Sequence, residues 1–433
     1  MRSVRIILTI VCLLAAATAQ AADDWAQILS DPQPSARYWH AMAWSGEDKV
    51  LLQGGTDGFD ETWIYDPGNS TWSLLDAPVH PQSLFWHSLV HIGDDQVLLF
   101  GGADGGYHDE TWVFDLSDSA WTEQNPASSP SARWIHDGIA YLGEDRALLF
   151  GGQDGGGYCG DTWVYDLSDN SWAQLIPPDG PTARWGHAMA SIGENRVVLF
   201  GGYDAGGRDD ETWLFDLGEN SWTQQDPAVK PSARYEHAMA YIGDDQVLLF
   251  GGQTDSGYDD ETWVYDLSED NWTLDSNAVQ PSARSRYGLS ETSIDGSTPL
   301  VMFGGCNVTA LGETWLFGGG DYLSLPSAIS DLKADLAGEA IRLSWSEITE
   351  NTGGNPLTVD HYTIYRSDDP GFTPGPGDSV AGTADTVYVD LSAAVKDTST
   401  NHSYVVKAVD SAGRKSSESN RVGEFDRQVM VKP

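Results

Sequence analysis

The strongest constraint in this 433-residue chain is a unit of about fifty residues that occurs six times. Each copy carries a Gly-Gly pair after an apolar run such as Val97–Phe100, and successive pairs are 47, 50, 50, 50 and 53 residues apart. A repeat of this length predicts a small unit that buries its apolar face only against the next copy. The pairs lie at 54–55, 101–102, 151–152, 201–202, 251–252 and 304–305.

Each unit contains four strand-like runs joined by turn sequences. In the fifth copy we predict strands over 235–242, 246–250 and 261–265, and a fourth that begins near Trp272. A near-constant period of four-stranded units favours the blades of a β-propeller over an array of β-sandwiches. The sixth unit lacks the second Trp, whereas Trp25–Ile28 matches the fourth strand of the third unit. We therefore expect Trp25–Ile28 to complete the last sheet and close the ring.

The repeated residues resemble the kelch repeat. The resemblance rests on the Gly-Gly pair, an acidic-Thr-Trp triplet, a second Trp nine residues later in five copies, and an Arg-x-x-His segment before most copies. It implies an all-β, six-bladed kelch-type β-propeller over 23–325. It assigns no activity, because one fold hosts many functions. The glycines allow positive φ and the paired indoles fill the space between blades, so we interpret both as structural.

The two ends of the chain carry different signals. Residues 1–22 have the basic start, apolar run and small-x-small site of a secretory signal peptide. Residues 326–425 resemble a fibronectin type III domain, a β-sandwich in which Trp345 lies in an early strand and Tyr404 stands at the tyrosine corner. Residues 426–433 form a tail. The whole resembles an exported bacterial-type protein, and we expect a secreted, periplasmic or cell-surface location.

Net charge narrows the range of partners. The chain has 65 acidic and 23 basic residues, and residues 23–325 contribute 49 and 11 of them. Such a surface argues against binding nucleic acid or an anionic membrane. No segment after the signal peptide is long and apolar enough to span a bilayer. We expect a monomer that binds a protein or a carbohydrate on one propeller face.

The Arg-x-x-His segments provide the main candidate binding site. They fall on the loops between successive blades, which emerge on the same face as the loops between second and third strands. A ring of arginines at the channel mouth is suited to an acidic peptide or a carboxylated sugar. In the structural alternative, ion pairs between blades neutralise the arginines with the acids that precede Thr-Trp in each repeat. The candidate lip is Arg37, Arg133, Arg184, Arg234, Arg284 and Arg286, with Trp86 at an apolar gap beside Leu84.

Histidines and cysteines have mainly structural interpretations. The repeated histidines lie on separate blades and cannot converge to the distance of about 2 Å that a metal needs. We expect buried hydrogen-bonding roles for His40, His87, His136, His187 and His237. Cys159 and Cys306 lie on opposed blades, too far apart for a disulfide, so we predict free thiols.

Acidic loops with glycines make calcium the one cofactor that the sequence suggests, although no loop has the full spacing of a known calcium motif. A solvated, turn-forming loop is the alternative interpretation. The calcium candidates are Asp104, Asp109, Asp204, Asp209, Asp255 and Asp259.

Two classes of function remain open at this stage. The favoured one is a secreted, non-catalytic binding or scaffold protein with no cofactor. The alternative is a kelch-type carbohydrate-active enzyme, such as a protein similar to sialic-acid epimerases, for which Asp137 and Glu236 are the acid or base candidates. A copper-radical oxidase of kelch architecture is disfavoured, because neither cysteine has the matching sequence context.

Overall fold

The computed structural model describes residues 25–423 except 31, 47, 57–59, 69, 83, 136, 194, 277–278, 293–298, 319–328, 338–339, 350–356, 369–377, 392–401, 411–414 and 417–418. The predicted signal peptide, the expected domain junction at 325/326 and the tail lie outside the described residues. The described chain is built from strands. Within it, no helix has the length and apolar character needed to cross a membrane.

Residues 25–318, here called the repeat domain, form six four-stranded antiparallel sheets in the described ranges, one for each repeat. Sheet 1 contains β2 (Ala41–Trp44), β3 (Val50–Gln53), β4 (Thr62–Asp66) and β5 (Thr71–Leu75). Sheet 2 contains β6 (Ser88–Gly93), β7 (Gln96–Phe100), β8 (Thr111–Asp115) and β9 (Ala120–Gln124). Sheet 3 contains β11 (Ile139–Gly143), β12 (Arg146–Phe150), β15 (Thr162–Asp166) and β16 (Ser171–Leu175).

The remaining sheets of the repeat domain follow the same order. Sheet 4 contains β17 (Ala188–Ser191), β18 (Arg196–Phe200), β21 (Thr212–Asp216) and β22 (Ser221–Gln225). Sheet 5 contains β23 (Ala238–Gly243), β24 (Gln246–Phe250), β27 (Thr262–Asp266) and β28 (Asn271–Asp275). Sheet 6 contains β29 (Gly288–Glu291), β30 (Leu300–Phe303), β31 (Thr314–Phe317) and β1 (Trp25–Ile28).

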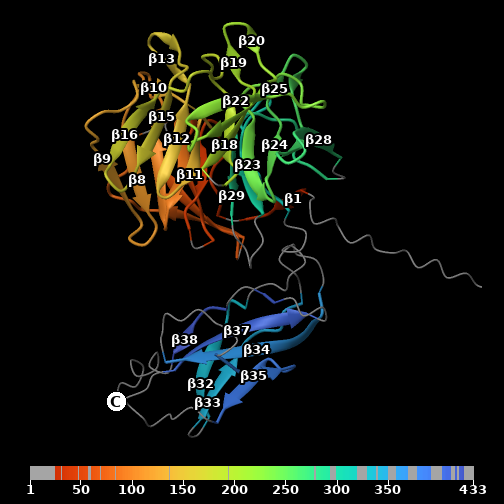
Figure 1. The fold of residues 1–433 in the computed structure, drawn as a ribbon. Coiled ribbons are helices and arrows are strands. Elements are labelled where there is room, and N and C mark those ends of the chain that lie inside the picture. Colours follow the sequence, from red (N-terminus) through yellow and green to blue (C-terminus); the bar gives the residue numbers. More distant parts are fainter. Residues whose placement is uncertain are drawn as a thin grey trace, which may run out of the picture.

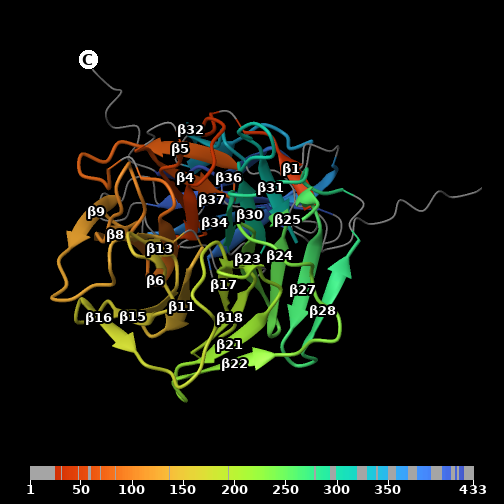
Figure 2. The ribbon, with the colours of Figure 1, turned by 90° about the horizontal axis from the view of Figure 1, so that it is seen from above.

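The sheets follow one another around a common axis, as Figure 2 shows. The first strand of each repeat contacts its counterparts in the two neighbouring sheets, and β29 contacts β2, so the series returns to its start. Each second strand is packed between sheets on both sides; Val97, Leu98, Leu99 and Phe100 are 0% exposed. This is why these strands are continuous apolar runs rather than alternating ones. The arrangement is consistent with a β-propeller.

The N-terminal strand β1 pairs with β31, with Trp25 opposite Phe317, and therefore joins sheet 6. This is the pairing expected from the match between Trp25–Ile28 and a fourth strand. Trp25 is 0% exposed and donates its indole N–H to Thr262 Oγ1 of sheet 5 at 3.0 Å. The second Trp of each other repeat makes the same bond to the Thr of the preceding sheet: Trp72–Thr314, Trp121–Thr62, Trp172–Thr111, Trp222–Thr162 and Trp272–Thr212.

The loops between second and third strands carry additional short hairpins. They are β13 (Gln153–Asp154) with β14 (Gly157–Tyr158), β19 (Tyr203–Asp204) with β20 (Gly207–Arg208), and β25 (Gln253–Thr254) with β26 (Gly257–Tyr258). They project at one end of the repeat domain, beside β10 (Arg133–Trp134), which pairs with β13 (Figure 1). In the fifth repeat the first strand begins at Ala238 and not at Tyr235, because Glu236 has a φ of +53° that no strand accommodates.

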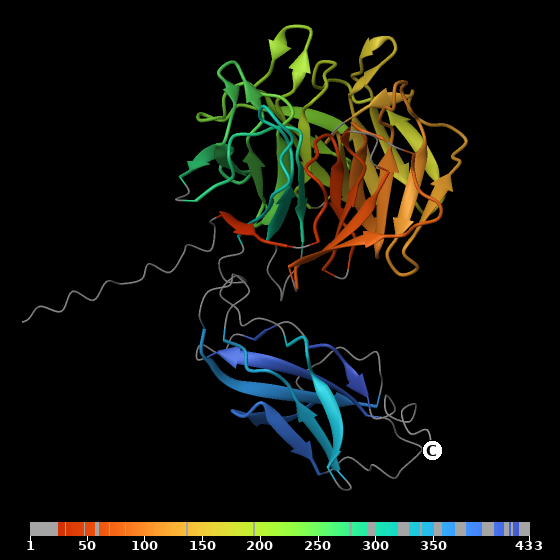
Figure 3. The ribbon, with the colours of Figure 1, turned by 180° about the vertical axis from the view of Figure 1, so that it is seen from behind.

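Residues 329–423 form two sheets, which Figure 3 shows stacked on each other. One contains β32 (Lys333–Ala337), β33 (Ala340–Ser344) and β36 (Val387–Asp390); the other contains β35 (Ser379–Thr383), β34 (Val359–Ser367), β37 (Ser403–Asp410) and β38 (Val422–Gly423). Their inward residues share one core that includes Leu343, Trp345, Ile364 and Val406. This is a β-sandwich. The hydroxyl of Tyr404 donates to the Asp390 carboxylate at 3.0 Å, a side-chain partner rather than the backbone partner of a tyrosine corner.

Candidate functional site

The five repeated arginines are buried, with 0–1% of each residue exposed. In the fourth repeat, Arg184 Nη2 lies 2.7 Å from Glu211 Oε2, and Arg184 Nη1 donates to the carbonyl of Gly201 at 3.0 Å. Glu211 also accepts the indole N–H of Trp213 at 2.9 Å. The corresponding ion pairs are Arg37–Glu61, Arg133–Asp161, Arg184–Glu211, Arg234–Glu261 and Arg284–Glu313.

These contacts correct the expected position of the arginine lip. The guanidinium groups of the five arginines do not face the channel mouth, since each is enclosed within its own repeat. The backbone of each arginine serves the preceding sheet: the carbonyl of Arg234 accepts the N–H of Gly202 at 2.9 Å. Each arginine therefore fastens two neighbouring sheets, and the geometry favours the structural interpretation of this residue type.

The second repeat shows how the arrangement changes where the arginine is missing. Leu84 is 3% exposed at this position. Glu110, the acid of the triplet, instead lies 3.0 Å from His108 Nδ1, and Asp104 lies 2.7 Å from His108 Nε2. Burial alone would lower the pKa of His108, but the two carboxylates raise it above its usual value. The acid of the triplet thus has a basic partner in this repeat as well.

Repeated histidines are buried beneath the Gly-Gly pairs. His40, His87, His187 and His237 are 0–1% exposed, and His40 Nε2 lies 3.1 Å from the carbonyl of Phe303. The sixth repeat has Tyr287 at this position, and its hydroxyl donates to the carbonyl of Phe250. His136 lies outside the described residues. In the third repeat Ile135 packs against Gly152, at the place where the histidines pack in other repeats.

We predict that replacing His187 by tyrosine makes the repeat domain less sensitive to acid. Burial, assisted by the charge of Arg184, lowers the pKa of His187 to about 3. In the unfolded chain, where the histidine pKa is about 6.5, this side chain becomes protonated below that pH, whereas in the folded state it remains neutral. The free energy of unfolding therefore falls as the pH drops from about 6.5 toward 3. The repeat-6 residue Tyr287 shows that the fold accepts tyrosine at this position.

The measurement is urea unfolding followed by tryptophan fluorescence between pH 4 and 8. The variant should lose less stability than the wild type between pH 7 and pH 4. Equal slopes for wild type and His187→Tyr would contradict the prediction.

Six residues surround the end of the axis on the hairpin side, each two positions after the repeated arginine or Leu84. We call them the mouth ring: Trp39, Trp86, Ile135, Gly186, Glu236 and Arg286. Backbone hydrogen bonds connect them in series. The N–H of Trp86 donates to Trp39, that of Trp39 to Arg286, that of Arg286 to Glu236, and that of Glu236 to Gly186, while Ile135 donates to Trp86.

Four non-glycine members of the mouth ring hold a left-handed backbone conformation. The φ values are +59° for Trp39 and Trp86, +53° for Glu236 and +63° for Arg286, whereas the fourth repeat has Gly186 at +64°. This conformation costs a residue other than glycine about 1–3 kcal/mol. The third repeat moves the strain to Asp137 at +56° because it carries one extra residue before β11. The sequence thus retains side chains where glycine is the less costly choice.

A partly buried ion pair from two different repeats occupies the mouth ring. Glu236 is 2% exposed, and its Oε2 lies 2.6 Å from Arg286 Nε and 2.9 Å from Gln253 Nε2. Its Oε1 lies 3.4 Å from the indole nitrogen of Trp39, whose ring is stacked under the Arg286 guanidinium at 4.7 Å. Glutamate and arginine occur once each at this position, so the pair breaks the sixfold pattern. The positive charge of Arg286 is neutralised by Glu236.

Aromatic rings continue from this pair through the first five repeats. We call this series the aromatic arc: Trp39, Trp86, Trp134, Trp185 and Tyr235. Successive ring centroids lie 4.1, 4.1, 6.2 and 5.3 Å apart. All five side chains are half-buried. Of these residues, only Trp86 is among the candidates selected from the sequence. Trp134, Trp185 and Tyr235 directly follow repeated arginines, and this regular aromatic position is the signal that could have revealed them.

Comparison with protein families agrees with this repeated geometry. The model of the KLHDC2/KLHL20/DRC7 Kelch-repeats domain matches residues 77–226 and 176–321, which together are more than half of the chain. The chain belongs to the Kelch-repeat family. The matched residues include the Gly-Gly pairs and the acid-Thr-Trp triplets of the second to sixth repeats, and five of the six residues of the mouth ring. No curated protein matches the chain at a significant level.

The six calcium candidates lie in pairs on three loops, Asp104 with Asp109, Asp204 with Asp209 and Asp255 with Asp259, and five of them contact protein groups. Asp204 accepts the N–H groups of Gly206 and Gly207, and Asp255 lies 2.8 Å from Arg208. Asp209 and Asp259 lie near Arg184 and Arg234, and burial raises the pKa of both carboxyls. Asp104 pairs with His108; Asp109 is exposed. Among the described residues no three acidic, histidine or cysteine side chains gather as a metal site requires.

Both cysteines of the described kelch domain are free thiols, as predicted. Burial raises the pKa of Cys159 to about 11 and also raises that of Cys306. The reactive form of cysteine is the thiolate. Both thiols are therefore poor nucleophiles at neutral pH.

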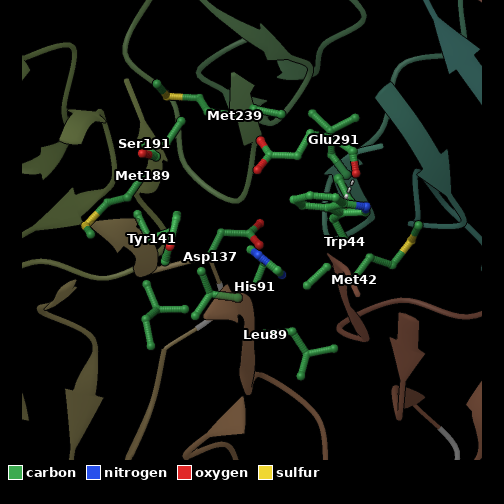
Figure 4. Close-up of a pocket in the computed structure, with 18 residues that line it drawn as sticks. Met42, Trp44, Leu89, His91, Asp137, Tyr141, Met189, Ser191, Met239 and Glu291 are labelled. Atoms are coloured by element: carbon green, nitrogen blue, oxygen red, sulfur yellow. Dashed lines mark hydrogen bonds between the residues drawn. The ribbon is translucent and has the colours of Figure 1, made fainter. Parts of the chain in front are cut away.

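Along the axis of the kelch domain lies a narrow cavity of about 80 Å³. His91, Asp137 and Glu291 point into it from three different repeats, together with Trp44 and Tyr141 (Figure 4). Burial raises the pKa of Glu291 to about 7 and lowers that of His91 to about 4. Of the two acid or base candidates, Asp137 lines this cavity while Glu236 lies in the mouth ring, so the structure does not bring them together as one pair.

Proposed function

We propose that this protein is a non-catalytic binding or scaffold protein that uses the mouth face of a six-bladed kelch propeller. The observation that carries the proposal is the set of non-glycine residues that hold a strained, left-handed backbone conformation in the mouth ring. Strained backbone positions are concentrated at functional sites, because function is what retains a locally unfavourable residue. Kelch repeats suggest a protein-interaction scaffold more generally, and six four-stranded sheets around one axis support the propeller architecture.

The other parts of the proposal rest on sequence and topology. We infer export from the signal-peptide pattern of residues 1–22. The two-sheet sandwich of residues 329–423 supports a fibronectin type III module, which would space or attach the propeller. With the propeller closed by β1, the mouth face is one coherent surface assembled from all six repeats. Such a surface recognises a partner through its central aromatic and charged residues rather than through its rim.

The test uses a double variant in which Trp39 and Trp86 are both replaced by glycine. Glycine is the natural residue in the fourth repeat and fits the left-handed conformation, so the fold should persist. Immobilised full-length protein is incubated with the secreted and envelope fractions of the producing cells, and retained material is quantified. We expect the double variant to retain at least ten-fold less of the partner than the wild type.

The matched control replaces the exposed rim residues Ile176 and Leu274 by alanine and should retain the partner fully. Circular dichroism and a melting curve confirm that each variant is folded. A second variant, Gly186→Trp, adds a side chain of the kind found at Trp39 and should obstruct the mouth. The proposal fails if both mouth variants retain the partner, or if only the rim variant loses it.

A further inference from the structure

We propose that the ligand of the mouth is a neutral carbohydrate chain, bound across the aromatic arc at Trp134 and Trp185. This inference rests on the proposed function, because it names the class of ligand for the same face. Three properties of the described residues support it: the charge of the mouth, its unused hydrogen-bond donors and the shape of its aromatic surface.

The charge of the mouth excludes a ligand that needs a free ion partner. The five repeated arginines are buried in ion pairs, and Arg286 is neutralised by Glu236 at 2.6 Å. Arg208, on a neighbouring hairpin, lies 2.8 Å from Asp255 and over the ring of Tyr235. The surrounding domain carries 49 acidic and 11 basic residues over 23–325. This negative field would repel an anionic ligand. The one carboxylate of the mouth ring, Glu236, is already paired with Arg286, so it offers no free partner to a cationic ligand.

Unused donors indicate a ligand that brings oxygen atoms. The indole nitrogens of Trp86, Trp134 and Trp185 are buried and have no hydrogen-bond partner among the described residues. These three residues and Glu236 line one small pocket of about 10 Å³, the space of a single hydroxyl group or water. Buried N–H groups normally have partners. A hydroxyl-bearing ligand supplies acceptors that an apolar ligand lacks.

The aromatic arc supplies the remaining contact. Trp134 and Trp185 are half-buried with ring centroids 6.2 Å apart and an interplanar angle of 31°. Two tilted indole faces at this spacing are suited to consecutive sugar rings, whose C–H faces are apolar while their hydroxyls lie at the edges. Sites of this type combine aromatic walls with a few directed polar groups. The hairpins β13–β14 and β19–β20 stand beside these two residues, with Tyr203 packed against Trp185 at 6.1 Å.

The experiment is affinity electrophoresis of the full-length protein through gels that contain dextran, mannan, galactan, xylan or mixed-linkage β-glucan. Alginate, polygalacturonate, poly-glutamate and poly-lysine serve as charged probes. We expect retardation by at least one neutral polysaccharide, unchanged in 1 M NaCl, where the Debye length is about 3 Å. Fluorescence titration with the matching oligosaccharide then gives the affinity.

Three variants locate the site. Trp134→Ala removes an aromatic face and should weaken binding at least ten-fold. Trp185→Phe retains a ring but removes the N–H donor and should weaken binding about five-fold, the worth of one hydrogen bond. Ile176→Ala, on the rim, should bind as the wild type does. Melting curves show that the variants are folded.

The inference is overturned if no neutral polysaccharide retards the protein, if only charged probes do so and 1 M NaCl abolishes the effect, or if the two tryptophan variants bind as the wild type does. Capture of a protein partner that Trp39→Gly/Trp86→Gly abolishes, without retardation by any polysaccharide, would reject the carbohydrate and leave the proposed function intact. Capture that survives in the mouth variants would reject the proposed function itself.

Discussion

Replacing Trp25 by alanine is expected to lower the free energy of unfolding of the repeat domain by about 3–5 kcal/mol, the usual cost of emptying a buried aromatic site. Trp25 is 0% exposed between Phe250 and Phe317, whose ring centroids lie 5.1 and 5.2 Å from its own. The substitution also leaves the Thr262 hydroxyl without its indole donor. Removing residues 25–28 altogether should be more damaging, because β31 then becomes an unpaired edge and the ring opens.

The measurement is denaturant unfolding followed by tryptophan fluorescence, which reports the repeat domain because Trp345 is the only tryptophan beyond it. Trp25→Phe is the matched variant: it retains most of the packing and loses only the hydrogen bond, at a cost of about 1 kcal/mol. Trp222→Ala, an equivalent site in the middle of the chain, should cost about as much as Trp25→Ala. An unchanged unfolding midpoint for Trp25→Ala, or for the deletion, would show that β1 does not hold the ring closed.

Arg184→Ala is expected to destabilise the repeat domain by about 3–5 kcal/mol, the range found when one partner of a buried ion pair is removed. The guanidinium is 0% exposed and contacts Glu211, the carbonyl of Gly201 and the carbonyl of Thr182. Its loss leaves these acceptors unsatisfied in a partly buried site. If Arg184 instead belonged to a ligand-binding lip, alanine would change ligand affinity and leave the stability near that of the wild type.

The second repeat provides a control for this prediction. There, Leu84 stands in place of the arginine, and His108 pairs with the acid Glu110 instead. His108 occupies the position that Asp209 holds in the fourth repeat. The double variant Arg184→Leu/Asp209→His transfers this solution to the fourth repeat. We expect it to be at least 1 kcal/mol more stable than Arg184→Leu alone, because the new histidine partners Glu211. Equal stabilities would mean that the acid needs no basic partner.

Much of the repeat architecture could be predicted from local patterns. The second strand of the fifth repeat, β24, has the predicted bounds of 246–250, and β27 begins one residue after the predicted start. These strands are unambiguous because a short apolar run ends at a glycine pair or is bounded by turn residues. The first strand is shorter than predicted, since a non-glycine residue in the left-handed conformation interrupts the extended backbone at Glu236. A sequence pattern does not reveal that conformation.

The site was less accessible to prediction than the strands. Arg184 and its counterparts recur at regular spacing, and this regularity favoured the interpretation as an exposed arginine lip at the channel mouth. Their burial depends on how adjacent sheets enclose them, which the spacing does not show. Trp185 and Trp134 follow these arginines in sequence but belong to a different surface. The neutralising contact between Glu236 and Arg286 joins residues fifty positions apart in consecutive repeats. Only their convergence near the axis makes them partners.

The amino-acid sequence by itself determined that this chain is all-β and repeated, with glycine pairs, indoles and a matching N-terminal strand at fixed spacing. Those features make contacts within one repeat or between equivalent positions of neighbouring repeats, so their regular spacing can be recognised in the amino-acid sequence. Tertiary structure alone decided which charges are buried and which aromatic residues meet at the mouth. That outcome depends on the six unequal residues that the ring brings together at its axis, and distances between them are set by sheet packing rather than by position in the chain.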